Sequence, residues 1–314
     1  MSDYNTNYSV KDATSSSNVD LTNIFQLNPN SPSITTTFFN PPYTISGTAP
    51  FVEYVSGWYI LTFNSSSSIT FNTITTVYTT VVGGGGGGGS AESSSNDYAS
   101  GGNGGSVCNA SFSSDTNKIT ITVGSGGTGG TGGNGSNGNT SSISSSSINI
   151  SCPGGNYGVS GHFWPSGQSA VTSSGVTLVS FTPENSITAG NFRLGHEGIY
   201  QYSNGINGIG IFIPPNSSRL EYFGGGGASN GTYCGYIFHL TSPPSGGLGG
   251  GGNGGYNFQT NSSSTNPTYS FIEAGSGING RGGGGGGATY FYDSGSGDGG
   301  DGGSGCVVFC FKYP

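Results

Sequence analysis

The sequence predicts an all-β protein that combines strands of a β-sandwich or jelly-roll-like type with packed polyglycine-II segments. Three observations predict this class. Short runs of β-branched and aromatic residues recur between turns of Gly, Ser and Asn. Gly accounts for 64 of the 314 residues, and several Gly segments repeat with a period of three. The chain also holds 18 Tyr, 18 Phe and 2 Trp, an aromatic content that disfavours a disordered polymer.

Residues 1–50 are expected to form a polar N-terminal arm that docks to other proteins. The opening stretch MSDYNTNYSV has neither the basic region nor the apolar region of a secretory signal. No run of about 18 apolar residues is present to span a membrane. Within the arm, the stretch VDLTNIFQL is expected to form one short helix capped by Asp20.

Residues 51–314 are expected to form one glycine-rich β domain in which strands alternate with Gly segments. Strands are predicted in GWYILTF at 57–63 and in KITITVG at 118–124, which alternates with a period of two. The Thr-, Val- and Ile-rich run 68–82 is also predicted as strand, and it would span about 50 Å if continuous. Residues 156–223 hold few long Gly runs and are a candidate strand-rich insertion or, alternatively, the distal recognition face.

Three later runs place apolar side chains on one face of a strand. The closing run, CVVFCFKYP at 306–314, is expected to be a central strand, because a segment at the chain end stays ordered only when it is tied into the sheet. The residues that share a face are Val176 with Leu178, Ile209 with Ile211 and Ile213, and Val307 with Phe309, Phe311 and Tyr313.

The Gly segments are predicted to be ordered rods, with mobile surface loops as the alternative. From Gly126 the chain reads GGTGGTGGNGSNGNT, so that every third residue is polar as far as Thr140. A polyproline-II-type helix has three residues per turn and no internal hydrogen bonds, so its backbone must pair with neighbouring chains. Gly at the two inner positions admits those neighbours, and the third position faces solvent. Residues 126–140 are expected to form one rod about 45 Å long.

No catalytic, cofactor-binding or metal-ligating residue is predicted. The pattern GxGxxG occurs too often to indicate a nucleotide site, and no helix or GK[ST] motif follows Val82. The histidines, His162, His196 and His239, do not have the spacing of metal ligands.

The aspartates of YDSGSGDGGDGGSG faintly resemble glycine-rich calcium repeats, but the nonapeptide register is missing. Asp298 and Asp301, with Ser304, are instead expected at solvent-facing third positions, and Asp293 lies just before them.

The five cysteines are expected to be free thiols, because an odd and sparse set is not typical of a disulfide framework. Cys306 and Cys310 would lie about 13 Å apart along one strand, too far to share a disulfide or a metal, and are expected to be small buried apolar residues. The remaining three are Cys108, Cys152 and Cys234.

The charge distribution disfavours nucleic acid as a partner. The formal net charge is −8, and the six basic residues are scattered along the chain. Binding to phosphate backbones or to anionic membrane surfaces needs a basic patch, and none is available.

The order of these features resembles the glycine-rich domain of phage tail-fibre and adhesin proteins, of some bacterial surface proteins and of virion proteins of giant DNA viruses. The resemblance covers residues 51–314. Cys306 and Cys310 depart from it, because that family has aliphatic residues there. The motifs that carry it are VVGGGGGGG at 81–89, GGNGG at 101–105, ITVGSGGTGGTGGNG at 121–135, NGNTSSI at 137–143 and the closing GGSGCVVFCFKYP at 302–314.

The resemblance implies a non-enzymatic structural protein of a virus particle: a minor capsid, fibre or surface-attachment component of a giant DNA virus, made in the host cytoplasm and located in the virion. The implied partners are other virion proteins, further copies of the chain in an oligomer or lattice, and a host surface glycan or protein, without nucleic acid, membrane insertion or cofactor. The alternatives are a phage tail-tip adhesin that binds a host receptor, an ice-binding protein that presents Thr128 and Thr131, and an enzyme, for which no nucleophile–base pair is evident.

Overall fold

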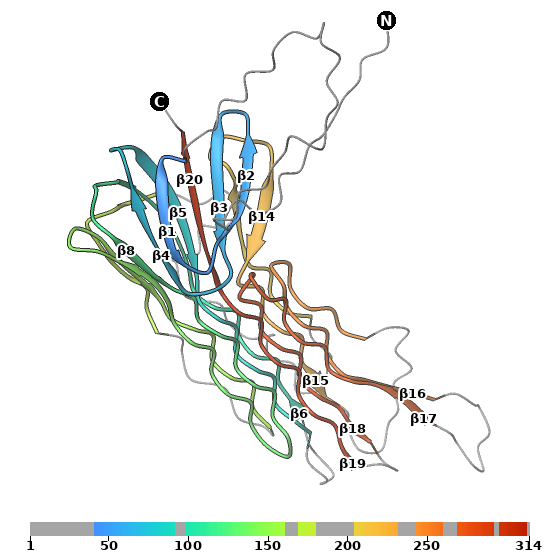
Figure 1. Ribbon diagram of the computed structural model, residues 1–314. Coiled ribbons are helices and arrows are strands. Elements are labelled where there is room, and N and C mark those ends of the chain that lie inside the picture. The colour runs from blue at the N-terminus through green and yellow to red at the C-terminus, as the bar shows by residue number, and fades with distance from the viewer. Residues whose placement is uncertain are drawn as a thin grey trace, which may run out of the picture. The chain divides into compact units, whose positions relative to one another are not determined.

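The computed structural model describes residues 41–91, 98–160, 169–179, 204–231, 243–259, 269–291 and 295–312. The chain divides into two units, Met1–Pro41 and Pro42–Pro314, and every described strand lies in the second unit. The described residues of that unit form strands, turns and extended segments without a helix, which confirms the all-β class (Figure 1). The short helix expected near Asp20 lies outside the described residues.

Two six-stranded antiparallel sheets pack face to face as a sandwich. The first sheet has the order β1 (Tyr43–Gly47), β4 (Ser67–Phe71), β8 (Ile119–Thr122), β9 (Ser141–Ser144), β10 (Asn149–Cys152) and β11 (Thr172–Ser174). The second has the order β12 (Thr177–Leu178), β7 (Val107–Ser113), β5 (Thr76–Val82), β20 (Cys306–Lys312), β3 (Trp58–Phe63) and β2 (Phe51–Val55).

Four two-stranded ladders complete the described secondary structure. They are β13 (Ile209–Phe212) with β14 (Leu220–Phe223), β15 (Asn230–Gly231) with β6 (Tyr98–Ala99), β16 (Tyr256–Gln259) with β17 (Tyr269–Ile272), and β18 (Tyr290–Phe291) with β19 (Gly295–Ser296). The ladder β13–β14 covers part of the second sheet, whereas the other three lie at the end of the glycine segments away from the sandwich (Figure 1).

The closing strand β20 is buried on both faces, so it is central as predicted. Val307, Phe309 and Phe311 point into the main core between the two sheets. Cys306, Val308 and Cys310 point to the opposite face, where they form a second core with residues of β13 and β14: Ile209, Ile211 and Phe223. Both cysteines are therefore small buried core residues, as the sequence indicated.

The run 68–82 is not one long strand, and this expectation was wrong. It divides into β4 and β5, which belong to different sheets. The side chains give the reason: Ile69 of β4 and Val77 of β5 line the same core from opposite sides, so the chain has to cross between the sheets near Ile74, which is 72 % exposed. Both halves contain β-branched residues, which favour strands, so strand propensity does not locate the crossing.

One predicted segment boundary also differs from the structure, and one predicted insertion is described only in part. The N-terminal arm was expected to extend to residue 50, yet β1 pairs with β4 in register from Tyr43–Phe71 to Gly47–Ser67, because Tyr43 and Ile45 pack against the main core. Of the insertion expected at 156–223, the described parts are split between the sandwich, the second core and the glycine segments. Residues 161–168 and 180–203 lie outside the described part of the chain.

Candidate functional site

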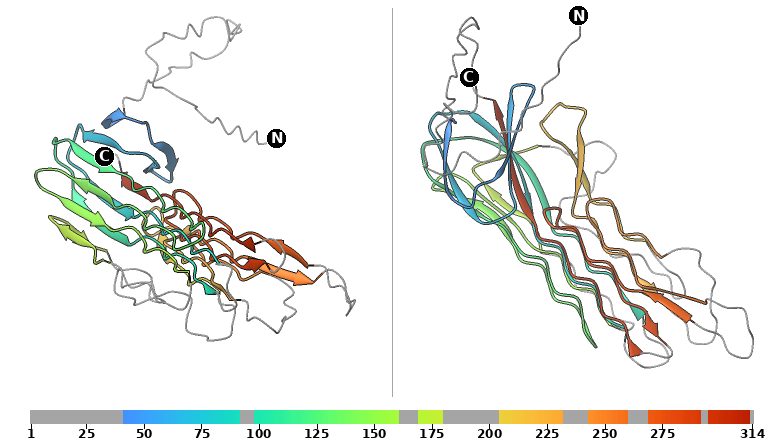
Figure 2. Two further views of the ribbon diagram at one scale, coloured as in Figure 1. Left: turned by 90° about the horizontal axis from the view of Figure 1, so that it is seen from below. Right: turned by 45° about the vertical axis from the view of Figure 1, so that its right-hand side comes forward.

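The glycine segments continue directly from the ends of the strands and run side by side (Figures 1 and 2). Segments from distant parts of the sequence, coloured green, teal and red, alternate across the bundle (Figure 2). We call each segment a rod and name it by its residues. The rods are 83–91, 100–106, 124–131, 133–140, 153–160, 204–208, 224–229, 243–248, 251–255, 273–278, 282–289 and 297–305.

Rod 83–91 donates backbone hydrogen bonds to three neighbours in strict rotation. Gly83, Gly86 and Gly89 donate to carbonyls of rod 100–106 at 2.9–3.0 Å. The residues that directly follow these three donate to rod 133–140, and the residues after those donate to rod 297–305. The donor number rises by three while the acceptor number falls by three, so each of these neighbours is antiparallel. The acceptors are Ser106, Asn103 and Ser100, then Asn139, Ser136 and Gly133, then Gly303, Gly300 and Gly297.

The carbonyls of the same rod accept hydrogen bonds from three further rods, all parallel to it. The donors are Gly155 and Gly158, Gly127 and Gly130, and Gly285 and Ala288. Rod 83–91 is thus enclosed on six sides, with three residues per turn and hydrogen bonds that run between rods. This is the pairing of packed polyglycine II, which confirms that the Gly segments are ordered rods.

The steric contacts explain why seven consecutive glycines are needed in this rod. A Cβ added at Gly85 would lie 2.0 Å from the carbonyl oxygen of Gly283, and one at Gly88 would lie 1.9 Å from that of Gly286. Real Cβ atoms do not approach so closely. Rod 282–289 is enclosed in the same way, by rods that include 83–91 and 224–229, and it also contains an uninterrupted run of glycines.

Rods at the rim of the bundle show the predicted period of three. In rod 124–131, Ser125, Thr128 and Thr131 are exposed, whereas Gly127 and Gly130 are buried. The pattern of two glycines and one polar residue therefore belongs to a rod with one open side. An unbroken Gly run belongs to a rod with none.

Residues 126–140 do not form the single rod that was expected. They fold back at Gly132, whose φ of +68° favours glycine, into the antiparallel rods 124–131 and 133–140. The two are joined by hydrogen bonds from Ser136 to Thr128 and from Asn139 to Ser125, each 2.9 Å from N to O. The period of three persists through the turn, so the period alone could not reveal it.

Polar side chains at the third positions do more than face solvent. The side-chain oxygen of Asn137 accepts the backbone N–H of Tyr157 at 2.9 Å, and that of Asp301 accepts the N–H of Gly129 at 2.7 Å. These side chains occupy places where a further rod would otherwise supply a carbonyl. The same role is filled by Asn134 for Ser160, Asn204 for Ser245, Asn207 for Leu248 and Asn279 for Ser304. Sequence reasoning missed this role, although the recurrence of Asn at third positions is its signal.

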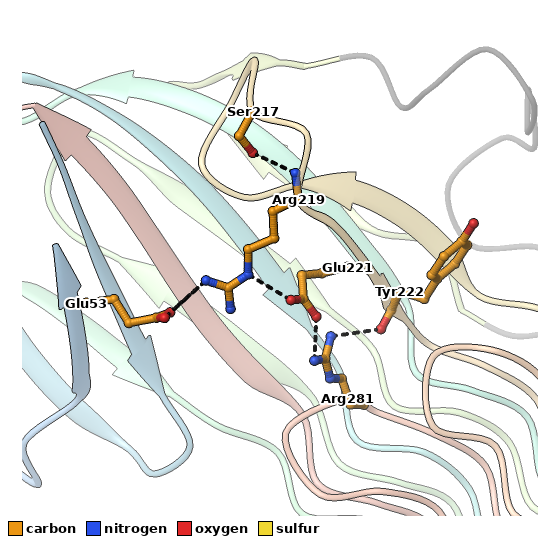
Figure 3. Close-up of polar contacts among 6 residues, drawn as sticks. All are labelled: Glu53, Ser217, Arg219, Glu221, Tyr222 and Arg281. Carbon is orange, nitrogen blue, oxygen red and sulfur yellow. Dashed lines mark hydrogen bonds and ion pairs between the residues drawn. The ribbon is translucent and has the colours of Figure 1, made fainter. Parts of the chain in front are cut away.

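A chain of charged side chains joins the ladder β13–β14 to the sandwich and to a rod (Figure 3). Arg219 contacts Glu53 of β2 at 3.1 Å and Glu221 of β14 at 2.9 Å. Arg281, which precedes rod 282–289, pairs with Glu221 and lies 5.0 Å from the centre of the Phe223 ring. Partial burial raises the pKa of Glu221, but hydrogen bonds from both arginines outweigh it and hold that pKa below its usual value. The two arginines and two glutamates of this cluster are therefore paired with one another.

Only some of the residues considered as sites in the sequence lie in the described part of the chain. Asp298 and Asp301 are exposed positions of rod 297–305, as predicted, whereas Ser304 is half-buried. His162, His196, His239, Asp293, Trp164 and Cys234 lie outside the described residues. Within the described part of the chain, no three His, Cys, Asp or Glu side chains gather as metal ligands do, and no helix there is long and apolar enough to cross a membrane.

Residues 62–312 match the model of a protein family described as a glycine-rich domain. The match begins within β3 and ends at the last residue of β20, so it takes in most of the sandwich and all of the rods. No curated protein matches the chain.

Proposed function

The chain belongs to the glycine-rich domain family, and from that premise we propose that it is a non-enzymatic structural protein of a virus particle. It serves as a minor capsid, fibre or surface-attachment component of a giant DNA virus and is located in the virion. The observation that carries the proposal is the rod bundle. A bundle whose inner backbone groups are hydrogen-bonded between rods suits a mechanical role, because the bundle is held together by these bonds.

The arrangement of the bundle supports an attachment role in particular. The short ladders β6–β15, β16–β17 and β18–β19 lie together at the end of the rods away from the sandwich (Figure 1). That end is held in place by the rods, so it is suited to contact other virion proteins, another copy of the chain, or a host surface glycan or protein. The net charge of −8 disfavours contact with nucleic acid.

The test is to locate the protein in purified virus particles. Mass spectrometry of particles washed at high salt, with and without protease treatment of the intact particle, is expected to detect the chain. An exposed attachment protein is expected to be digested. A chain found only in infected cell lysate, and absent from the particles, would refute the proposal.

A phage tail-tip adhesin is the second candidate, favoured by the same cluster of ladders at one end of the rods. Immunogold labelling of intact particles separates the two, because an adhesin labels only the tail tip whereas a capsid component labels the shell. The ice-binding alternative gains no support from the described rim. Asp301 of the neighbouring rod reaches Gly129, and Thr128 is hydrogen-bonded to Ser136, so no second Thr row flanks the first.

A further inference from the structure

Two cysteines that are far apart in the sequence meet where the two sheets separate. Rods 100–106 and 153–160 run antiparallel and are joined by hydrogen bonds, the last from the Ser106 N–H to the Pro153 carbonyl at 3.0 Å. Beyond this bond the first rod enters β7 of the second sheet, and the other is reached from β10 of the first sheet. Cys108 lies two residues after Ser106, and Cys152 directly precedes Pro153.

The two sheets begin to separate at the Ser106–Pro153 hydrogen bond, and we call this place the fork. Stacked sheets lie about 10 Å apart, whereas a disulfide needs Cα atoms about 4.4–6.8 Å apart. At the fork the two backbones are within hydrogen-bonding distance at Ser106 and Pro153, two residues before Cys108 and one after Cys152. The Cys108 and Cys152 thiols each shift the pKa of the other, so the two side chains lie close together. They are 2 % and 0 % exposed in the main core.

We propose that Cys108 and Cys152 are a disulfide-forming pair that links the two sheets when the chain folds in an oxidising medium. The proposal is independent of any role in a virus particle. It also does not conflict with the free thiols of the structure, which are the reduced state of the same pair.

The disulfide forms by thiol–disulfide exchange in two steps. One of the two cysteines attacks first, as its thiolate. Its target is a small-molecule disulfide such as oxidised glutathione, and one small thiolate leaves as a mixed disulfide forms.

The other cysteine then loses its proton to solvent, and its sulfur attacks the sulfur of the first cysteine and releases the second small thiolate. Two protein thiols lose two protons and two electrons in total, and the small disulfide is reduced to two thiols. Because both side chains are buried in the folded protein, the exchange takes place while the chain is folding.

Cys306 and Cys310 are a matched internal control. They are also buried, and burial raises the pKa of each thiol to about 12. They lie four residues apart on one strand, about 13 Å along it, which is beyond the reach of a disulfide.

The experiment is to express the full chain in bacteria with a disulfide-permissive cytoplasm and in bacteria with a reducing one. Each product is alkylated in denaturant without reductant and measured by intact mass and peptide mapping. The oxidised product is expected to carry two fewer alkyl groups, to contain a peptide pair that joins Cys108 to Cys152, and to have a Tm several degrees higher. The variant C310S is expected to keep the cross-link, and C108S to lose it.

Because peptide mapping of the unaltered chain identifies the link directly, the test does not depend on a variant that folds. Alkylation of both Cys108 and Cys152 in folded protein from the oxidising cytoplasm would overturn the proposal, as would a link from either one to another cysteine.

Discussion

Each residue of a rod is constrained by the side of the rod on which it lies. Gly130 donates its N–H to Gly88 at 2.9 Å, and a Cβ at this position would lie 2.1 Å from the Gly133 carbonyl oxygen. Thr131, the next residue, is exposed. Adjacent residues of one rod should therefore differ sharply in the side chains that they accept.

Gly130→Val is expected to lower the free energy of unfolding by about 2–4 kcal/mol through steric clash and lost bonds between rods. Thr131→Val is expected to change it by no more than about 0.5 kcal/mol, as at other exposed sites. Denaturant titration of the two variants beside the parent measures both effects. Equal changes near zero would be the behaviour of a flexible linker and would contradict the packed rod.

Asn137→Ala is expected to lower the free energy of unfolding by about 0.5–1.5 kcal/mol, because the Tyr157 N–H loses its acceptor. Hydrogen exchange of the Tyr157 amide is expected to quicken at the same time. Asn137→Asp retains an acceptor oxygen, so it is expected to slow the exchange again relative to the alanine variant. Unchanged exchange in both variants would show that the side chain only faces solvent.

At the scale of elements, β20 connects the two cores of the protein. Phe309 lies in the main core, with its ring centroid 5.8 Å from that of Phe63 and 6.0 Å from that of Phe112. Phe309→Ala is expected to cost about 3–5 kcal/mol of unfolding free energy. Phe51→Ala on edge strand β2, where the side chain is 63 % exposed, is the control and is expected to cost much less. Similar losses in the two variants would place β20 outside the core.

The attachment of the ladder β13–β14 is expected to weaken in acid. The pKa of Glu221 is held below its usual value of 4.5, so its ion pairs contribute fully above about pH 4.5 and are lost as the pH falls through the lowered pKa. Glu221→Gln is therefore expected to lower Tm at pH 7, and its difference from the parent is expected to shrink below about pH 4. A difference that is constant between pH 7 and pH 3 would exclude a role for the charge.

At the scale of the whole molecule, the bundle is held by hydrogen bonds between rods without a metal centre among the described residues. A chelator is therefore expected to leave the melting curve unchanged. Scanning calorimetry with and without chelator checks this. A fall in Tm of several degrees would show that a bound cation stabilises the fold, and the exposed Asp298 and Asp301 would be the first residues to substitute.

The sequence alone determined the local properties of the chain. The all-β class follows from strand composition, and the rods follow from a period of three that only an extended helix of three residues per turn explains. The exposure of Thr128 and Thr131 follows from that period, and the central position of β20 from its alternating apolar residues. Each of these properties depends on residues that are neighbours in the chain, so it can be predicted from the sequence alone.

Only the tertiary structure decided which segments meet. The crossing between β4 and β5, the fold-back at Gly132 and the meeting of Cys108 with Cys152 depend on contacts between distant segments. Such contacts leave no period in the sequence. The same holds for the enclosure of rod 83–91, whose six neighbours come from residues 100 to 303. Its seven glycines indicate close packing, but the identity of the packed neighbours is set by hydrogen bonds that span most of the chain.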